Sequence, residues 1–166
     1  MKEFVKGLNI HEQEIEIKVD DLYFRPSSYG LIIDDGKIAL LRSTVNNKYI
    51  FPGGGVDLGE TMEEAMKREV VEETGLVVET ADFIDAADAF FEYTPDNLKF
   101  HAIQFFYLCT VSNNSLITTD QIVDDNAVKQ PQWVDISGLK IEDFSKHEGD
   151  LIERLLNKIQ NPSVSQ

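Results

Sequence analysis

Short stretches in which apolar residues alternate with polar ones, or dominate, predict most of this chain as β-strands. EIEIKV over 14–19 alternates strictly, and FHAIQFFYLCTV over 100–111 has the strongest strand pattern. The stretches 29–33 and 37–42 flank Asp34-Asp35-Gly36, and an Asp-Gly pair in that position predicts a β-hairpin. RPSS at 25–28 is expected to break the strand pattern. Shorter or acid-interrupted strand patterns occupy 48–51, 76–89, 90–93 and 132–134.

Two segments carry helix signals instead. Thr61 followed three residues later by Glu64 is a capping-box pattern, helix-favouring residues continue for about three turns, and Gly75 is a typical stop. Ser145 and Glu148 form a second capping-box pattern ahead of a helix with an apolar stripe. That stripe consists of Leu151, Ile152, Leu155, Leu156 and Ile159.

Together these elements predict one domain, 1–166, of the α+β class. The strands come in hairpins rather than in regular alternation with helices, which favours a mixed β-sheet packed between helices as an α/β/α sandwich. A chain of 166 residues suits a single domain with a substantial core. That core is expected over about 25–160, with 1–12 as a loose peripheral element and 161–166 as a frayed tail.

The formal net charge of −15 at pH 7 restricts the partners of this protein. So acidic a chain repels DNA, RNA and anionic membranes, and it repels a polyphosphate substrate unless cations lie between the two. No apolar run approaches a membrane span, and the N-terminal stretch does not resemble a secretory signal. Cys109 is the single cysteine, so we expect no disulfide, a cytoplasmic location and a buried thiol.

The predicted central helix carries a cluster of acids soon after three glycines at 53–55. Glu69, Glu72 and Glu73 stand at i, i+3 and i+4, so they share one helix face, where like charges destabilise an isolated helix. A hard divalent cation such as Mg²⁺ would offset that repulsion, and backbone carbonyls without neighbouring side chains are open to a metal. The alternative is a charge-rich helix face that is merely solvated.

The spacing of residues 54–76 favours the first interpretation. The segment reads Gly54, five residues, Glu60, seven residues, Arg68-Glu69-Val70, one residue, Glu72-Glu73, one residue, Gly75-Leu76. At every defined position this resembles the signature of the Nudix hydrolase family, and the resemblance extends loosely over about 25–160. It implies a loop–helix–loop catalytic motif on a mixed sheet between helices. It also implies hydrolysis of a pyrophosphate bond in a nucleoside diphosphate-linked compound, with Mg²⁺ or Mn²⁺ as cofactor.

The same resemblance implies roles for individual side chains. Glu69 and Glu73 would bind the metal directly, with Glu69 also assisting deprotonation of the attacking water, and Glu72 would bind directly or through water. Arg68 and Glu60 would orient these groups, since an arginine can hold a carboxylate bidentately. The carbonyl of Gly53 would add a ligand.

Family members often use one further acid outside this segment. Asp125 and Asp124, in the polar loop before Trp133, are the candidates here, and Glu92 is the alternative. The third option is that no further side chain is required.

Substrate contacts lie outside the signature. Arg25 and Arg42 are candidates for contacts to phosphate, and Phe51 and Tyr93 are candidates for stacking on a base. Surface charge or core packing is the competing interpretation of each.

We therefore expect a small-molecule nucleotide-type substrate: a (d)NTP, a dinucleoside polyphosphate or a nucleotide sugar. The alternative function is a catalytically silent nucleotide-binding sensor of the same fold. An isomerase of this fold would need a reactive cysteine, for which Cys109 in its strand pattern is a poor candidate. The resemblance also suggests a homodimer.

Overall fold

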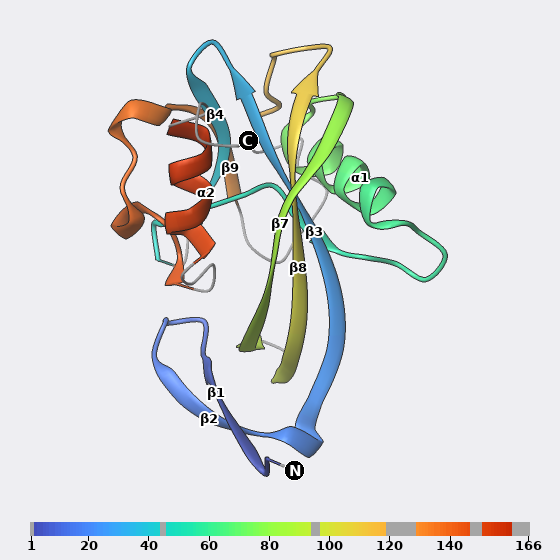
Figure 1. Ribbon diagram of the computed structural model, residues 1–166, viewed down its shortest axis with the longest axis vertical. Coiled ribbons are helices and arrows are strands. Elements are labelled where there is room, and N and C mark those ends of the chain that lie inside the picture. The colour runs from blue at the N-terminus through green and yellow to red at the C-terminus, as the bar shows by residue number, and fades with distance from the viewer. Residues whose placement is uncertain (1, 44–45, 94–96, 119–128, 147–150, 161–166) are drawn as a thin grey trace.

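The computed structural model describes residues 2–43, 46–93, 97–118, 129–146 and 151–160, and it shows a mixed β-sheet flanked by two helices (Figure 1). The helices are α1 (Met62–Thr74) and α2 (Leu151–Gln160). Across the sheet the strands run in the order β2 (Glu14–Lys18), β1 (Phe4–Leu8), β7 (Val78–Tyr93), β8 (Leu98–Val111), β3 (Leu22–Asp34), β4 (Lys37–Ser43) and β5 (Tyr49–Ile50). In addition, β6 (Gly53–Gly55) pairs with β3, and β9 (Lys129–Asp135) pairs with β4. Short 3₁₀ turns occupy Val19–Asp21, Ile136–Gly138 and Ile141–Asp143.

The centre of the sheet consists of three long strands. β3 and β8 run parallel from Leu22 opposite Lys99 to Ile32 opposite Cys109, whereas β7 and β8 are antiparallel. β7 is one continuous strand of 16 residues, although its acids suggested an interruption. Two register shifts, at 78–80 and 83–85, take up the irregularity, because a β-bulge bends a strand without ending it.

The predicted hairpin is confirmed, but its first strand is longer than expected. Asp35 and Gly36 have φ of 45° and 73°, the positive values that a two-residue Asp-Gly turn requires. Residues 25–28 lie inside β3, so the expectation that they break the strand is wrong. Each of them pairs with β8, and Ser27 and Ser28 also pair with β6, so this tertiary pairing overrides the local signal.

Two apolar clusters, one on each face of the sheet, confirm the α/β/α arrangement. Successive strand residues point to opposite faces, and the neighbours Leu31 and Ile32 accordingly belong to different clusters. Leu31 packs with the predicted stripe of α2, of which Leu151 and Leu155 are fully buried. Ile32 packs with Cys109 and α1. The second capping-box pattern includes Glu148, which lies outside the described residues.

The N-terminal segment is part of the sheet, which corrects the expectation that 1–12 is loose. β1 pairs with all of β2 and reaches β7, where Leu8 lies opposite Phe91. In the turn between β1 and β2, Oε1 of Glu12 accepts hydrogen bonds from Nδ2 of Asn46 at 2.8 Å and from Oγ of Ser145 at 3.0 Å. Backbone pairing and this carboxylate therefore tie the hairpin to segments far away in the sequence.

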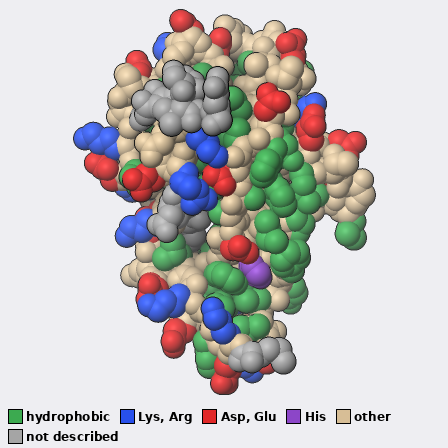
Figure 2. All heavy atoms as spheres, viewed as in Figure 1, with side chains coloured by type: hydrophobic (Ala, Val, Ile, Leu, Met, Phe, Trp, Pro, Cys, Tyr) green, Lys and Arg blue, Asp and Glu red, His purple; other side chains and the backbone are tan. Residues whose placement is uncertain are grey.

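On the surface, hydrophobic side chains gather in a continuous band among scattered charges (Figure 2). Exposed aromatic side chains of the sheet include Phe24 and Phe83. Among the helices of the described residues, none has the length and apolar character that crossing a membrane demands.

Candidate active site

The three glycines form the short strand β6 rather than a loop. This strand pairs antiparallel with β3, so that Ser28 lies opposite Gly54 and Tyr29 lies opposite Gly53. Gly53 has φ of 145°, a value that L side chains rarely adopt, and a Cβ there would collide with the carbonyl oxygen of Ser28. The first position of the strand therefore requires glycine for the backbone itself.

The next two glycines make room for charged side chains on opposite faces of β6. A Cβ on Gly54 would lie 2.6 Å from Oε1 of Glu69. A Cβ on Gly55 would lie 2.7 Å from Nε of Arg25. The absence of side chains thus lets an acid of α1 and a base of β3 approach the strand closely.

Helix α1 forms where the sequence predicts it. Oγ1 of Thr61 accepts from the backbone N–H of Glu64, and the Glu64 carboxylate accepts from the N–H of Thr61 at 2.8 Å. Gly75 ends the helix with φ of 75°. Met66 and Val70 are fully buried against the sheet, which fixes the rotation of the helix about its axis. As a result, the acids Glu69 and Glu73 lie against β6.

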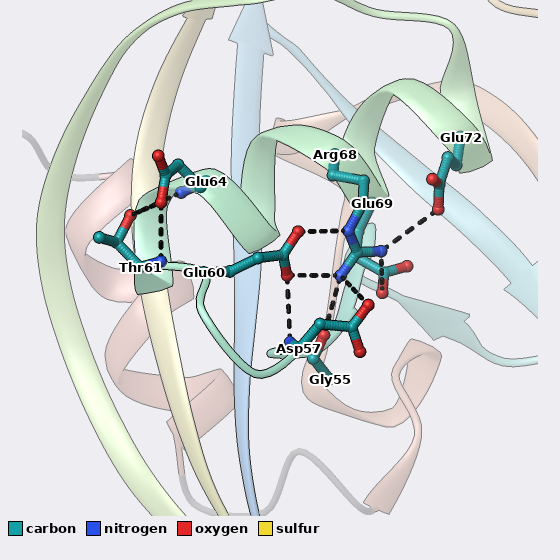
Figure 3. Close-up of polar contacts among 8 residues, drawn as sticks. All are labelled: Gly55, Asp57, Glu60, Thr61, Glu64, Arg68, Glu69 and Glu72. Carbon is teal, nitrogen blue, oxygen red and sulfur yellow. Dashed lines mark hydrogen bonds and ion pairs between the residues drawn. The ribbon is translucent and has the colours of Figure 1, made fainter.

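Arg68 connects the parts of the site (Figure 3). Its guanidinium forms a fork on Glu60, with Nε 2.7 Å from Oε1 and Nη2 2.9 Å from Oε2. Nη2 also donates to the carbonyl of Gly55 at 3.1 Å. Nη1 donates to Glu69 at 2.9 Å and to Glu72 at 3.3 Å. One cation therefore offsets the repulsion between acids on the same helix.

The charges of this network are fixed over a wide pH range. Hydrogen bonds from Arg68, and then the backbone N–H of Asp57, lower the pKa of Glu60 from 4.5 to about 2. The pKa of Arg68 is raised above its usual value, chiefly by the hydrogen bonds to Glu60. Both groups therefore stay ionised at neutral pH.

Glu73 is the buried acid of the cluster, with an exposed fraction of 3%. Its Oε2 accepts a hydrogen bond from the backbone N–H of Gly53 at 2.8 Å. This contact joins the last turn of α1 to the start of β6 and holds a carboxylate in the interior of the site.

These residues fit a hard divalent cation by the chemistry of their donors. Carboxylate and carbonyl oxygens are the ligands that Mg²⁺ and Mn²⁺ prefer, and the missing side chain of Gly54 lets the Glu69 carboxylate lie directly against the backbone of β6. In the described parts of the chain, no three acidic, histidine or cysteine side chains already converge on one point. Arg68 holds Glu69 and Glu72, while Glu73 is turned to Gly53. Binding would thus require side-chain rotation at the helix, with no change of fold.

The structure brings the residues of the predicted signature together around β6 and α1. These are Gly53, Gly54, Glu60, Arg68, Glu69, Glu72 and Glu73. Asp124 and Asp125 lie outside the described residues. Glu92 lies far from β6: Ala87 shares a row of the sheet with Ser27, and Glu92 is five residues, or about 16 Å, further along β7.

The two candidate arginines have different surroundings. Arg25 lies against Gly55, and its guanidinium carbon is 5.3 Å from the centre of the Phe100 ring. Arg42 is stacked over Tyr49 at 4.6 Å, and its Nε donates to Asn47 at 2.8 Å. Only Arg25 is thus placed beside the glycine strand.

The two candidate aromatic residues do not offer open faces beside the site. Phe51 is 1% exposed and packs against Phe106 and Phe144, with ring centres 5.9 and 5.4 Å away. The fold therefore uses Phe51 in the core rather than as a stacking surface. Tyr93 is the last residue of β7, opposite Leu98, at the end of the strand remote from β6.

Two further contributors were not anticipated from the sequence. The carbonyl of Gly55 accepts from Arg68, and Ser28 lies beside Gly54 with a fully buried side chain. Both depend on the pairing of β6 with β3, for which the local sequence carries no signal.

Comparisons with known proteins agree on one family. A sequence model of the NUDIX domain matches residues 24–155. The 8-oxo-dGTP diphosphatase of Haemophilus influenzae is 34% identical over 67% of this chain and 72% of its own length. The ADP-ribose pyrophosphatase of Methanocaldococcus jannaschii is 29% identical over 75% of this chain and 70% of its own length. The crystal structure of a MutT NUDIX hydrolase from Burkholderia pseudomallei superimposes with a TM-score of 0.60 at 20% identity, covering 81% of this chain and 97% of that one, and supports the fold.

Proposed function

Because this chain belongs to the Nudix hydrolase family, whose domain model matches residues 24–155, we propose that it is a divalent-metal-dependent pyrophosphohydrolase. Its substrate is a nucleoside diphosphate-linked small molecule, and the bond cleaved is a pyrophosphate bond. The observation that carries this proposal is the contact between Glu73 and Gly53, because it places a buried carboxylate at a strand of bare backbone.

The acids of α1 divide into ligands and orienting groups. Glu69 and Glu73 bind the metal, Glu72 binds it directly or through water, and the carbonyl of Gly53 adds a further oxygen. Held by these residues, Mg²⁺ or Mn²⁺ would supply charge neutralisation for the diphosphate, polarisation of a phosphoryl oxygen and a lower pKa for a water molecule. Glu69 lies against Gly54, and its carboxylate is proposed to accept the proton of the attacking water.

Arg68 and Glu60 are proposed as orienting groups for the acids of α1. The fork between them fixes the guanidinium, so its remaining nitrogen, Nη1, faces Glu69 and Glu72 in a set orientation. When those carboxylates turn away to bind a cation, the anchorage of Arg68 on Glu60 and Gly55 remains. Orienting groups of this kind set the geometry and basicity of metal ligands.

The phosphate chain of the substrate is proposed to contact Arg25. The guanidinium of Arg25 lies on the face of β6 opposite Glu69. A diphosphate that crosses the glycine strand would therefore contact the metal held by the carboxylates on one face and the permanent positive charge of Arg25 on the other. The known activities of the two relatives, on 8-oxo-dGTP and ADP-ribose by their names, support a nucleotide-type substrate without choosing one. The single buried cysteine supports a cytoplasmic location.

A product screen tests this proposal. Purified protein is incubated with Mg²⁺ and then Mn²⁺ against (d)NTPs including 8-oxo-dGTP, diadenosine polyphosphates, ADP-ribose, nucleotide sugars and a 5′-triphosphorylated RNA oligonucleotide. Products are identified by mass, and Glu73→Gln serves as the inactive control. Metal-dependent cleavage of one class, lost in the control, is the expected result.

Two outcomes would contradict it. Binding of a nucleotide without turnover under either metal would indicate the sensor alternative. Cleavage of the RNA end in preference to every small molecule would overturn the expectation drawn from the charge of −15.

A further inference from the structure

Ser28 is a buried polar residue that the proposed mechanism does not yet use. Its side chain is fully buried, and within the described part of the chain its Oγ has no hydrogen-bond partner. Removing a hydroxyl from water without giving it a partner costs free energy, so such a group is rare in native proteins and calls for an explanation.

The face of the sheet to which this side chain points follows from strand pairing. Residues directly opposite each other in an antiparallel pair point to the same face of the sheet, and Ser28 lies opposite Gly54. The open position at Gly54 faces the Glu69 carboxylate, whose two oxygens lie 2.6 and 2.9 Å from the place of a Cβ. The side chain of Ser28 therefore points to the face of the sheet on which α1 and Glu69 lie.

A second position on β3 supports the same direction. Gly30 points to the same face as Ser28, two residues further along, and a Cβ on Gly30 would lie 3.1 Å from Val70 and 3.3 Å from Met66 of α1. Ser28 is thus the next residue on this face of β3 after the apolar contact at Gly30, and it lies at the part of α1 that carries acids. Ser27, its neighbour in sequence, points to the opposite face.

We propose that Ser28 is a positioning residue for Glu69: its Oγ–H donates a hydrogen bond to the Glu69 carboxylate when that carboxylate leaves Arg68 to bind the metal. The inference rests on the proposed function, because it assigns a partner within the same site. In the present arrangement Glu69 Oε1 accepts from Nη1 of Arg68 at 2.9 Å. Rotation of the carboxylate loosens that contact, and the serine hydroxyl, which turns freely about its bond, supplies the replacement from the sheet side.

The simplest competing interpretation is that Ser28 is a small packing residue. In that case Ser28→Ala behaves alike with and without metal. The positioning interpretation makes a different prediction for each state. Without metal, alanine removes an unpartnered hydroxyl, so Tm stays the same or rises. With metal, alanine removes a hydrogen bond to a ligand, so binding weakens.

The test measures metal binding in the absence of substrate. Mn²⁺ affinity is determined by titration calorimetry on metal-free wild-type, Ser28→Ala, Ser28→Cys and Ser27→Ala proteins, and Tm is measured with and without Mn²⁺. We expect Ser28→Ala to weaken Mn²⁺ binding about tenfold, as removal of a group that hydrogen-bonds a metal ligand typically does. The rise in Tm on adding Mn²⁺ should be smaller as well. Ser28→Cys, with a weaker donor of similar size, should lie between alanine and wild type. Ser27→Ala, buried on the other face, should bind as wild type does.

Each contrary result has a separate meaning. Wild-type Mn²⁺ affinity in Ser28→Ala, or a lower Tm of its metal-free form, would overturn the role of Ser28 and leave the proposed function standing. Absence of Mn²⁺ binding in the wild-type protein would overturn the proposed function itself.

Discussion

The carboxylate of Glu73 accepts a hydrogen bond from the backbone N–H of Gly53 at 2.8 Å, across 20 positions of sequence. This contact joins the start of β6 to the last turn of α1. It buries an acid that would otherwise be hydrated, and the N–H provides part of the compensation for that burial.

Glu73→Gln separates the charge of this residue from its hydrogen bond. Glutamine keeps an oxygen acceptor for Gly53, so the protein should remain folded, while loss of the negative charge should reduce metal-dependent hydrolysis roughly 100-fold or more. Glu73→Ala should in addition destabilise the fold by about 1–3 kcal/mol, because the buried N–H is left unpaired. Rates with Mg²⁺ and urea unfolding measure the two effects. Full activity of Glu73→Gln would refute the role assigned to this carboxylate, and Glu63→Gln, an exposed acid on the same helix, is the control.

Arg68→Lys should impair the site although it retains the charge. Lysine lacks the planar fork that holds Glu60 through two nitrogens and reaches Gly55 as well. We expect a loss of activity of roughly 10- to 100-fold and a lower Tm.

The matched control for that variant is Lys67→Arg, one position earlier. Lys67 forms an ion pair with Glu63 one turn earlier on α1, and both side chains are partly exposed, so its replacement should change neither rate nor Tm. A wild-type rate and Tm in Arg68→Lys, as in Lys67→Arg, would mean that the positive charge at position 68 suffices without the fork.

The network around Glu60 should leave a mark on acid stability. Its pKa is lowered from 4.5 to about 2 by hydrogen bonds from Arg68 and the N–H of Asp57. A depressed pKa in the folded state contributes stability above about pH 4.5, and this contribution is lost as the pH falls toward 2. The stability difference between wild type and Glu60→Gln should accordingly be largest above pH 4.5 and shrink below it.

Denaturant unfolding over that pH range measures this difference. In an Arg68→Lys background the effect of Glu60→Gln should be smaller, since the fork is already absent. A pH-independent difference would show that Glu60 contributes through packing rather than through its charge.

Gly54→Ala should disturb catalysis more than folding. The added Cβ would lie 2.6 Å from Oε1 of Glu69, so the carboxylate must move, and a displaced ligand of this kind can lower a rate roughly 100-fold. Gly138→Ala is the control, because no atom of the described residues other than its chain neighbours lies within 4 Å of its Cβ position. Rates and Tm for both variants decide the matter: a wild-type rate in Gly54→Ala would mean that Glu69 need not lie against the strand.

Cys109 should be chemically inert in the native protein. Burial raises the pKa of its thiol from 9.0 to about 12, so only roughly one molecule in 10,000 carries the reactive thiolate at pH 8. Mass spectrometry after treatment with an alkylating reagent should show no modification of Cys109 until guanidinium is added to unfold the protein. Rapid alkylation of Cys109 in the folded protein would contradict the burial of its thiol, and an isomerase with a reactive cysteine would again have to be considered.

The local elements and the chemistry of the central motif were encoded in the sequence itself. The capping box at Thr61, the stop at Gly75 and the Asp-Gly hairpin depend on a few neighbouring residues, so each is visible in a short window. The acid spacing on α1 follows from helix geometry alone. Glu60 lies before the helix, so its pairing with Arg68 was predicted from the ability of arginine to hold a carboxylate bidentately.

Only the tertiary structure decided what these elements face. Because β3 pairs with β8 and β6, it continues as a strand through residues 25–28. Pairing of β1 with β2 and β7 makes the N-terminal hairpin part of the sheet. Phe51 packs against Phe106 in the core, so it is not a surface on which a base could stack. The same pairing of β3 with β6 set Arg25 and Ser28 on opposite sides of the glycines. A one-residue change of register would exchange those two sides. Such register is fixed by contacts between residues distant along the chain, and no window of local sequence contains them.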